Sequence, residues 1–60
     1  MFIEEVTVIQ MGVVYFWTLK KDGKMIATSE LIDKKDLVES EAVNISKQLG
    51  FNGTIFIEER

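Results

Sequence analysis

The sequence contains neither cysteine nor histidine. Without cysteine no disulfide can form, and without either residue the usual ligands of zinc, haem and iron-sulfur clusters are missing. General acid-base chemistry would fall to Asp, Glu, Lys or Tyr, and a nucleophile would have to be Ser, Thr or Lys. We therefore expect a protein without metal or cofactor that is not an enzyme.

A long apolar run is also missing, because no stretch approaches the roughly 20 residues that a membrane-spanning helix needs. Glu4 and Glu5 stand where a secretory signal would have basic residues and then an apolar run. The triplet Asn44-Ile45-Ser46 matches the glycosylation sequon but falls in a predicted helix of a chain without an export signal. These features predict a cytoplasmic protein with no membrane partner and an unmodified Asn44.

Basic residues are too few for a dedicated nucleic-acid binder, since seven Lys and Arg stand against ten Asp and Glu, for a net charge of −3. The 60 residues predict a single domain over 1–60. A domain of this size buries only about 60% of the surface that its unfolded chain exposes. Because neither a disulfide nor a metal can stabilise it, we expect self-association.

Three strands are predicted before residue 30. Residues 2–10 mix β-branched residues with alternation, Met11-Gly12 offers a two-residue break, and residues 13–20 form the second strand. Asp22-Gly23 is a stronger turn signal, since a type I′ turn needs positive φ at both central positions. It predicts a second hairpin that ends near Ser29.

A helix is predicted after Asp33, which is the expected N-cap. Asp36 in the first turn suits the positive end of the helix dipole. Gly50 is expected to end the helix in a left-handed conformation, after Lys47 in the last turn and with Phe51 folding back. The apolar positions recur at spacings of four, three and four, as one helix face requires, and are Val38, Ala42, Ile45 and Leu49.

A turn at Asn52-Gly53 leads into a short final strand, TIFIE, and completes the order β-β-β-α-β. We predict a two-layer α+β domain in which an antiparallel three-stranded meander packs on one helix. The C-terminal strand could lie parallel to the first strand at the sheet edge, or it could pair with another protomer. The sequence leaves both arrangements open.

Two-residue turns in both hairpins would set the register of the sheet. The expected opposed pairs are Val8 with Tyr15, Val6 with Trp17, Leu19 with Ile26, and Trp17 with Thr28. These residues share one face, which the helix would cover. Trp17 and Tyr15 are then large core side chains, each with its polar atom near the rim.

The opposite face of the predicted sheet, which also takes Ile3, is unusually apolar. The candidate interface on it consists of Ile9, Val14, Phe16, Met25, Ala27 and Phe56. One helix cannot cover both sides of a sheet. We expect a homodimer that packs sheet on sheet through these residues.

Residues 15–20 (YFWTLK), the Asp22-Gly23 turn, residues 26–30 (IATSE) and Lys35 ahead of a helix together resemble the YegP-like family of small domains of unknown function. The similarity spans about residues 13 to 48. It implies the β-β-β-α-β fold and a homodimer or a tandem pair, and it supplies no catalytic residues. The family usually has basic residues where this chain has Phe16 and Thr18, so the outer face here is more apolar than the resemblance implies.

Two clusters of charged residues are candidate sites. Carboxylates gather at Glu30, Asp33, Asp36, Glu39 and Glu41. Helix capping and the helix dipole account for the first of them, so we expect no metal there. A two-layer domain of this size also lacks depth for a substrate pocket, which argues against an enzyme. Lysines gather around the second turn, near Phe16, as in single-strand nucleic-acid recognition, and are Lys20, Lys21 and Lys24.

The preferred hypothesis is a non-enzymatic protein-interaction module: a homodimer whose remaining edge or helix face binds another protein. Its size, acidity and excess of apolar strand surface suit a regulatory or inhibitory factor, such as those of phages and mobile elements. The alternative is a single-stranded nucleic-acid-binding module that uses the three lysines and Phe16. Nothing in the sequence identifies the partner.

Overall fold

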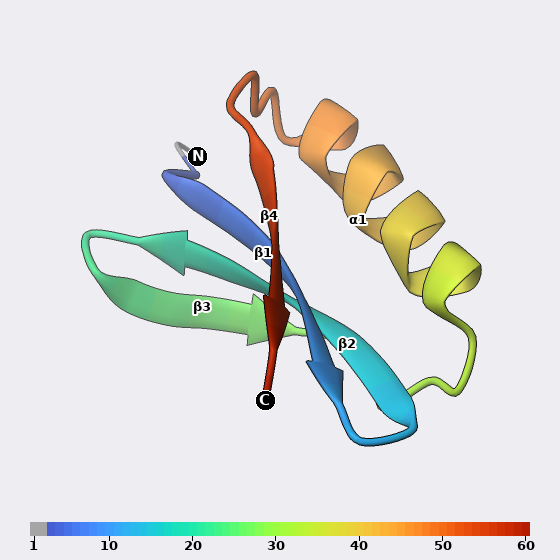
Figure 1. Ribbon diagram of the computed structural model, residues 1–60. Helices are drawn as coiled ribbons and strands as arrows, with labels where there is room; N and C mark the ends of the chain where they lie inside the picture. Colours follow the sequence, from blue (N-terminus) through green and yellow to red (C-terminus); the bar gives the residue numbers. More distant parts are fainter. Residues whose placement is uncertain (1–2) are drawn as a thin grey trace.

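The computed structural model describes residues 3–60, which form one sheet and one helix. In chain order the elements are β1 (Glu5–Met11), β2 (Val14–Lys21), β3 (Lys24–Thr28), α1 (Lys35–Gln48) and β4 (Ile55–Glu59). The strand order in the sheet is β3-β2-β1-β4, with β4 parallel to β1 and the other neighbours antiparallel (Figure 1). The predicted α+β class and the β-β-β-α-β order are confirmed, and the C-terminal strand pairs within the chain.

The first hairpin turns one residue later than predicted, with Gly12 and Val13 at its centre. Gly12 has a φ of 65°, and the first central position of a two-residue type II′ turn favours glycine because φ is positive there. Moving the turn by one residue shifts the pairing by two, so each side chain keeps its predicted face. The predicted pairs Val8–Tyr15 and Val6–Trp17 are wrong, and the observed pairs are Val8–Trp17 and Val6–Leu19.

The second hairpin has the predicted turn, with φ of 54° at Asp22 and 75° at Gly23. A β-bulge then interrupts the pairing of β2 with β3. Ile26 is the extra residue of the bulge, since its neighbours on β3 lie opposite consecutive residues of β2: Met25 opposite Lys20 and Ala27 opposite Leu19.

The bulge reverses the faces of the last residues of β3. Ala27 packs against the core beside Leu19, and Thr28 lies opposite Thr18 on the outer face. The predicted pairs Leu19–Ile26 and Trp17–Thr28 are therefore wrong, and so is the placement of Ala27 on the outer face.

The helix begins at Lys35, and Asp33 is not its N-cap. Lys34 occupies that position with an extended backbone and no side-chain capping bond. Asp36 in the first turn and Lys47 in the last turn are as predicted.

The C-terminus of α1 has the double hydrogen bond of a Schellman motif. The N–H of Gly50 donates to the carbonyl of Lys47, and the N–H of Phe51 donates to the carbonyl of Ser46. Gly50 has a φ of 75°, and Phe51 packs against the core, so the predicted helix stop is confirmed.

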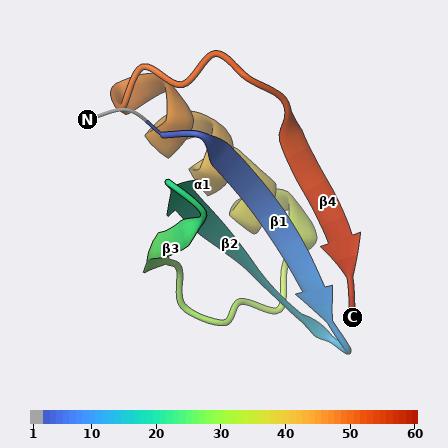
Figure 2. The ribbon, with the colours of Figure 1, turned by 90° about the vertical axis from the view of Figure 1, so that its left-hand side faces the viewer.

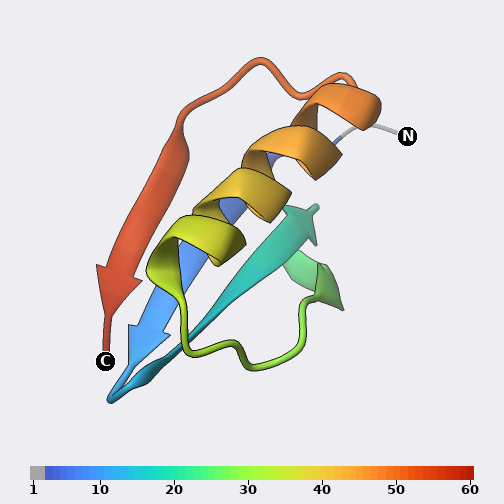
Figure 3. The same ribbon diagram turned by 90° about the vertical axis from the view of Figure 1, so that its right-hand side faces the viewer.

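α1 lies across one face of β1 and β2 and leaves β4 beside it uncovered (Figure 3). The core between helix and sheet consists of Ile3, Val6, Val8, Trp17, Leu19, Val38 and Ala42. Ile3 precedes β1 and turns inward, so its predicted place on the outer face is wrong. Ser46 is also buried, and its hydroxyl donates to the carbonyl of Ala42 at 2.6 Å.

Candidate functional site

The face of the sheet away from α1 is hollowed into an open groove of about 440 Å³, here called the outer trough. All four strands contribute to it, and Figure 2 shows them with α1 behind the sheet. The lining residues are Glu5, Thr7, Ile9, Phe16, Thr18, Lys20, Met25, Thr28, Phe56, Glu58 and Arg60. The apolar members of this lining are Ile9, Phe16, Met25 and Phe56.

The floor of the outer trough is buried although no helix covers it. Ile9 and Thr18 are each only 3% exposed, because the longer side chains around them rise above the sheet. The rims are exposed: Met25 on β3 is 59% exposed and Phe56 on β4 is 53% exposed. The outer face is therefore concave, with an apolar side chain at each margin.

The Thr18 hydroxyl in this floor is a buried polar group that makes no hydrogen bond. Its Oγ1 is buried and has no hydrogen-bond partner, and no other buried side-chain polar atom in residues 3–60 shares this condition. A buried hydroxyl without a partner costs about 1–3 kcal/mol. The outer trough thus contains a locally destabilising group.

Replacing Thr18 by valine should raise the free energy of unfolding by about 1 kcal/mol, since valine has the same shape and removes the unpaired hydroxyl. Urea denaturation followed by circular dichroism would measure the change. Thr28→Val is the control, because the Thr28 hydroxyl donates to the carbonyl of Trp17 at 3.2 Å and its loss should not stabilise the fold. Equal effects of the two changes would contradict this interpretation of Thr18.

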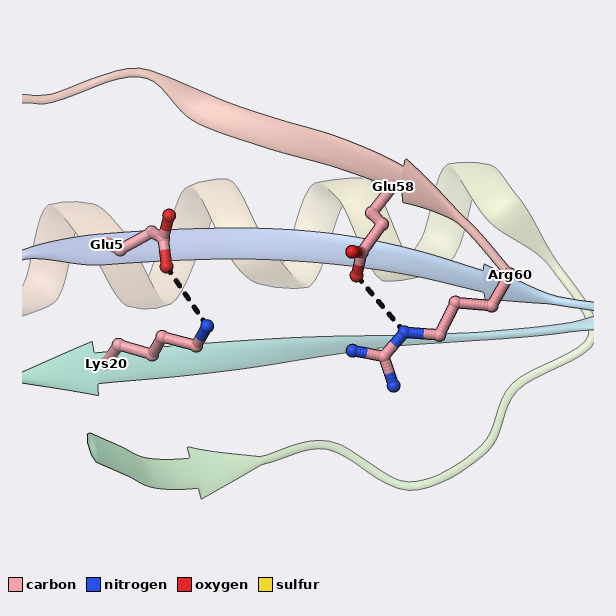
Figure 4. A network of polar contacts seen from close by, with 4 residues as sticks. All are labelled: Glu5, Lys20, Glu58 and Arg60. Carbon is pink, nitrogen blue, oxygen red and sulfur yellow. Dashed lines mark hydrogen bonds and ion pairs between the residues drawn. The ribbon is translucent and has the colours of Figure 1, made fainter. Parts of the chain in front are cut away.

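Two ion pairs stand at opposite ends of the outer trough (Figure 4). Lys20 Nζ lies 3.4 Å from Glu5 Oε2, and Arg60 Nε lies 3.2 Å from Glu58 Oε2. All four side chains are at least a third exposed, so each pair contributes less than about 1 kcal/mol to stability. Their effect is to give both ends of an apolar groove a polar boundary.

The predicted interface residues fall into three groups. Phe16, Met25 and Phe56 line the outer trough, and Ile9 is its floor. Val14 is half-buried opposite Met11, outside the lining, and Ala27 lies on the other face. The sheet-on-sheet homodimer stays a prediction, on a face that is more concave and less apolar than expected.

Sequence reasoning placed Glu5 and Lys20 on the outer face but missed the other polar end of the outer trough. Glu58 and Arg60 reach this face only because β4 lies parallel to β1, with Glu58 opposite Ile9. Nothing in the sequence chose between that pairing and one with another protomer.

Acidic groups are interspersed with the lysines at the tip of the second hairpin. Lys20 pairs with Glu5, and the carboxylate of Glu4 accepts a hydrogen bond from the N–H of Asp22. Lys21 is half-buried and Lys24 is exposed. No local excess of positive charge singles out this tip as a nucleic-acid surface.

The acidic cluster does not converge. Within residues 3–60 no three Asp or Glu side chains lie close enough together to hold a metal ion.

In the same part of the chain, no helix has the length and apolar character needed to cross a membrane.

A second hollow, of about 210 Å³, lies between the helix and the C-terminal strand. Its lining consists of Val8, Glu39, Val43, Ile55 and Ile57, and we call it the α1–β4 groove. It exists because α1 packs over β1 and β2. Ile55 therefore packs only against the margin of the core, and Ile57 is exposed.

Comparison of the chain with protein-family models, curated proteins and solved structures gives no match. The resemblance to the YegP-like family stays a prediction without further support.

Proposed function

We propose that this chain is a non-enzymatic protein-interaction module, a homodimeric regulatory or inhibitory factor of the cytoplasm, and that the outer trough binds an amphipathic helix of a partner protein. The observation that carries the proposal is the concave outer face, with exposed apolar rims at Met25 and Phe56. Exposed apolar surface of this kind marks binding sites in small domains.

A helix suits the outer trough better than an extended peptide. The trough is a sheet face, whose backbone groups are already used between strands, so it offers side chains and not a free edge. Three strand spacings of about 4.8 Å make the sheet about 14 Å wide, enough for one helix of about 10 Å diameter. A helix on this face would repeat what α1 does on the other.

The ion pairs define the length of the bound segment. From Glu5 to Ile9 the strand rises about 13 Å, between two and three helical turns. The partner helix should therefore carry an apolar stripe of that length, with polar residues at both ends against Glu5–Lys20 and Glu58–Arg60.

Photo-crosslinking in cells that make the protein tests this proposal. With a benzophenone amino acid in place of Met25, we expect an adduct with a second polypeptide, attached at a helical segment of the stated pattern. Phe16→Glu in the same chain should suppress the adduct, because it places a charge in the apolar middle of the outer trough. The control position is Leu37, an exposed apolar residue of α1, from which the adduct should be missing.

Two outcomes would overturn the partner helix. Equal adducts from Met25 and Leu37 would mean that the outer trough is not a specific site. An adduct of the chain with itself, lost in Phe16→Glu, would instead favour the sheet-on-sheet dimer.

The nucleic-acid alternative has no observation in its favour, since carboxylates neighbour the lysines of the hairpin tip.

A further inference from the structure

We infer that two copies of this chain join through the free edge of β4, pairing it antiparallel with β4 of the second copy to form one continuous sheet. This inference rests on the proposed function and deepens it, because it names the contact that makes the homodimer. The two-fold axis of such a pair stands perpendicular to the sheet. Both helices then lie on one side, and the two outer troughs open on the other.

Alternate residues of β4 have backbone groups without a partner inside the chain. The N–H of Arg60 donates to the carbonyl of Gln10 on β1 at 2.8 Å. In a parallel pair, alternate residues direct both backbone groups to the same neighbour, so Phe56 and Glu58 also face β1. Ile55, Ile57 and Glu59 therefore point their N–H and C=O groups outward along an open edge.

The two edges of the sheet differ in how they resist pairing. On β3 the bulge at Ile26 breaks the regular edge, and Lys24 places a charge on it, both of which discourage edge-to-edge association. β4 has no bulge, and its charged residues, Glu58 and Glu59, are confined to its C-terminal end. It exposes Phe56 and Ile57, the latter 58% exposed. A regular edge that begins with three apolar residues is suited to pairing with another strand.

The sequence of β4 suits pairing with itself about Phe56. In that register Phe56 faces Phe56 of the second copy, and Ile55 faces the second copy's Ile57. Ile55 and Ile57 are the residues with outward backbone groups, so these opposed residues can exchange hydrogen bonds. Glu58 and Glu59 then lie opposite Thr54 and Gly53, whereas a register centred two residues further toward the C-terminus would set Glu58 against Glu58.

The α1–β4 groove supplies the second part of the contact. Ile55 and Ile57 project to the helix side of β4, where Val43 of α1 is also partly exposed. Pairing brings the same residues of both copies together in the gap between the two helices. A standard protein–protein interface buries about 800 Å² of each partner. That is a fifth of the 4203 Å² of accessible surface of this chain. The edge of one five-residue strand buries less surface than that. We therefore expect a dissociation constant in the micromolar range.

Analytical ultracentrifugation of the full chain, over a concentration series from low micromolar to millimolar, tests the inference. The wild type should pass from monomer to dimer, and Ile57→Lys should move this transition to at least tenfold higher concentration. The matched control is Ile26→Lys, which changes another half-exposed isoleucine on the opposite edge strand and should dimerise like the wild type. Circular dichroism of each variant verifies the fold.

Amide hydrogen exchange gives a second readout that needs no substitution. In dilute wild type the N–H groups of Ile55, Ile57 and Glu59 should exchange fast, while those of Phe56, Glu58 and Arg60 are protected by β1. At high concentration this alternation should disappear as the outward groups become protected.

Three results would overturn the edge contact: a chain that is monomeric throughout, a dimer that Ile57→Lys leaves intact, or a dimer that forms while the alternation persists. A dimer that is lost in Phe16→Glu and kept in Ile57→Lys would place the contact on the outer trough. The proposed function is tested separately by the Met25 adduct, which an Ile57→Lys monomer should still form.

Discussion

Replacing Trp17 by alanine should lower the free energy of unfolding by about 3–5 kcal/mol, the usual cost of removing a buried large aromatic side chain. Trp17 is only 9% exposed, belongs to the core between sheet and helix, and lies opposite Val8. At 0.05–0.15 kcal/mol per residue, a 60-residue domain has a total stability of roughly 3–9 kcal/mol. A substantial fraction of the variant should therefore be unfolded at room temperature.

Circular dichroism during urea denaturation is the appropriate measurement, because the variant has no tryptophan left for fluorescence. Trp17→Phe is the matched control: it keeps an aromatic ring but loses the hydrogen bond of 3.2 Å from Nε1 to Glu41 Oε1. We expect it to cost about 1–2 kcal/mol, from the smaller ring and the lost bond. If Trp17→Ala cost no more than Trp17→Phe, Trp17 would not be central to the core.

The parts of the fold that could be predicted are those decided by neighbouring residues. Asp22-Gly23 specifies its turn through backbone preference alone, and Gly50 does the same for the end of α1. The spacing of Val38 and Ala42 directs one helix face to the sheet whatever the sheet's exact register. Local chemistry was sufficient for element order and for the face that the helix covers.

The errors lie where a non-local choice decided the outcome. Nothing in residues 24–28 marks Ile26 as a bulge, yet the bulge moves Ala27 from the predicted interface into the core. Asp33 is a good capping residue, but the chain reaches α1 with Lys34 at the cap position. In each case the path of the chain, and not the conformational preference of the local residues, determined the structure.

The candidate site also has a part that local residues predicted and a part that depended on distant segments of the chain. Phe16 and Met25 could be placed on the outer face because they lie close to the well-specified turn. The concave shape could not be foreseen, since it depends on Phe56, Glu58 and Arg60 arriving from the far end of the chain. The second rim and the second polar end of the groove arise only through the parallel pairing of β4 with β1.

Replacing Gly23 by valine should lower the free energy of unfolding by about 2–3 kcal/mol, through the backbone alone. Gly23 has a φ of 75°, a left-handed conformation that costs an ordinary residue about 1–2 kcal/mol and a β-branched residue more. A Cβ added at Gly23 meets no atom within 4 Å, so the Cβ itself does not collide with the rest of the fold. The loss therefore measures the strain of the turn itself.

The thermal midpoint should fall with the free energy, by about 4–8 °C for each kcal/mol in a domain of this size. Gly23→Asn is the informative comparison, because asparagine tolerates positive φ and also lacks a branched Cβ. It should lose less than half of what valine loses. Equal losses would mean that the side chain encounters something other than backbone strain, and an unchanged midpoint in Gly23→Val would mean that the turn adopts another conformation in solution. Because β2 supplies part of the floor of the outer trough and β3 one of its rims, a disturbed turn should also weaken the Met25 adduct. The edge pairing of β4, at the opposite margin of the sheet, should persist while the domain is folded.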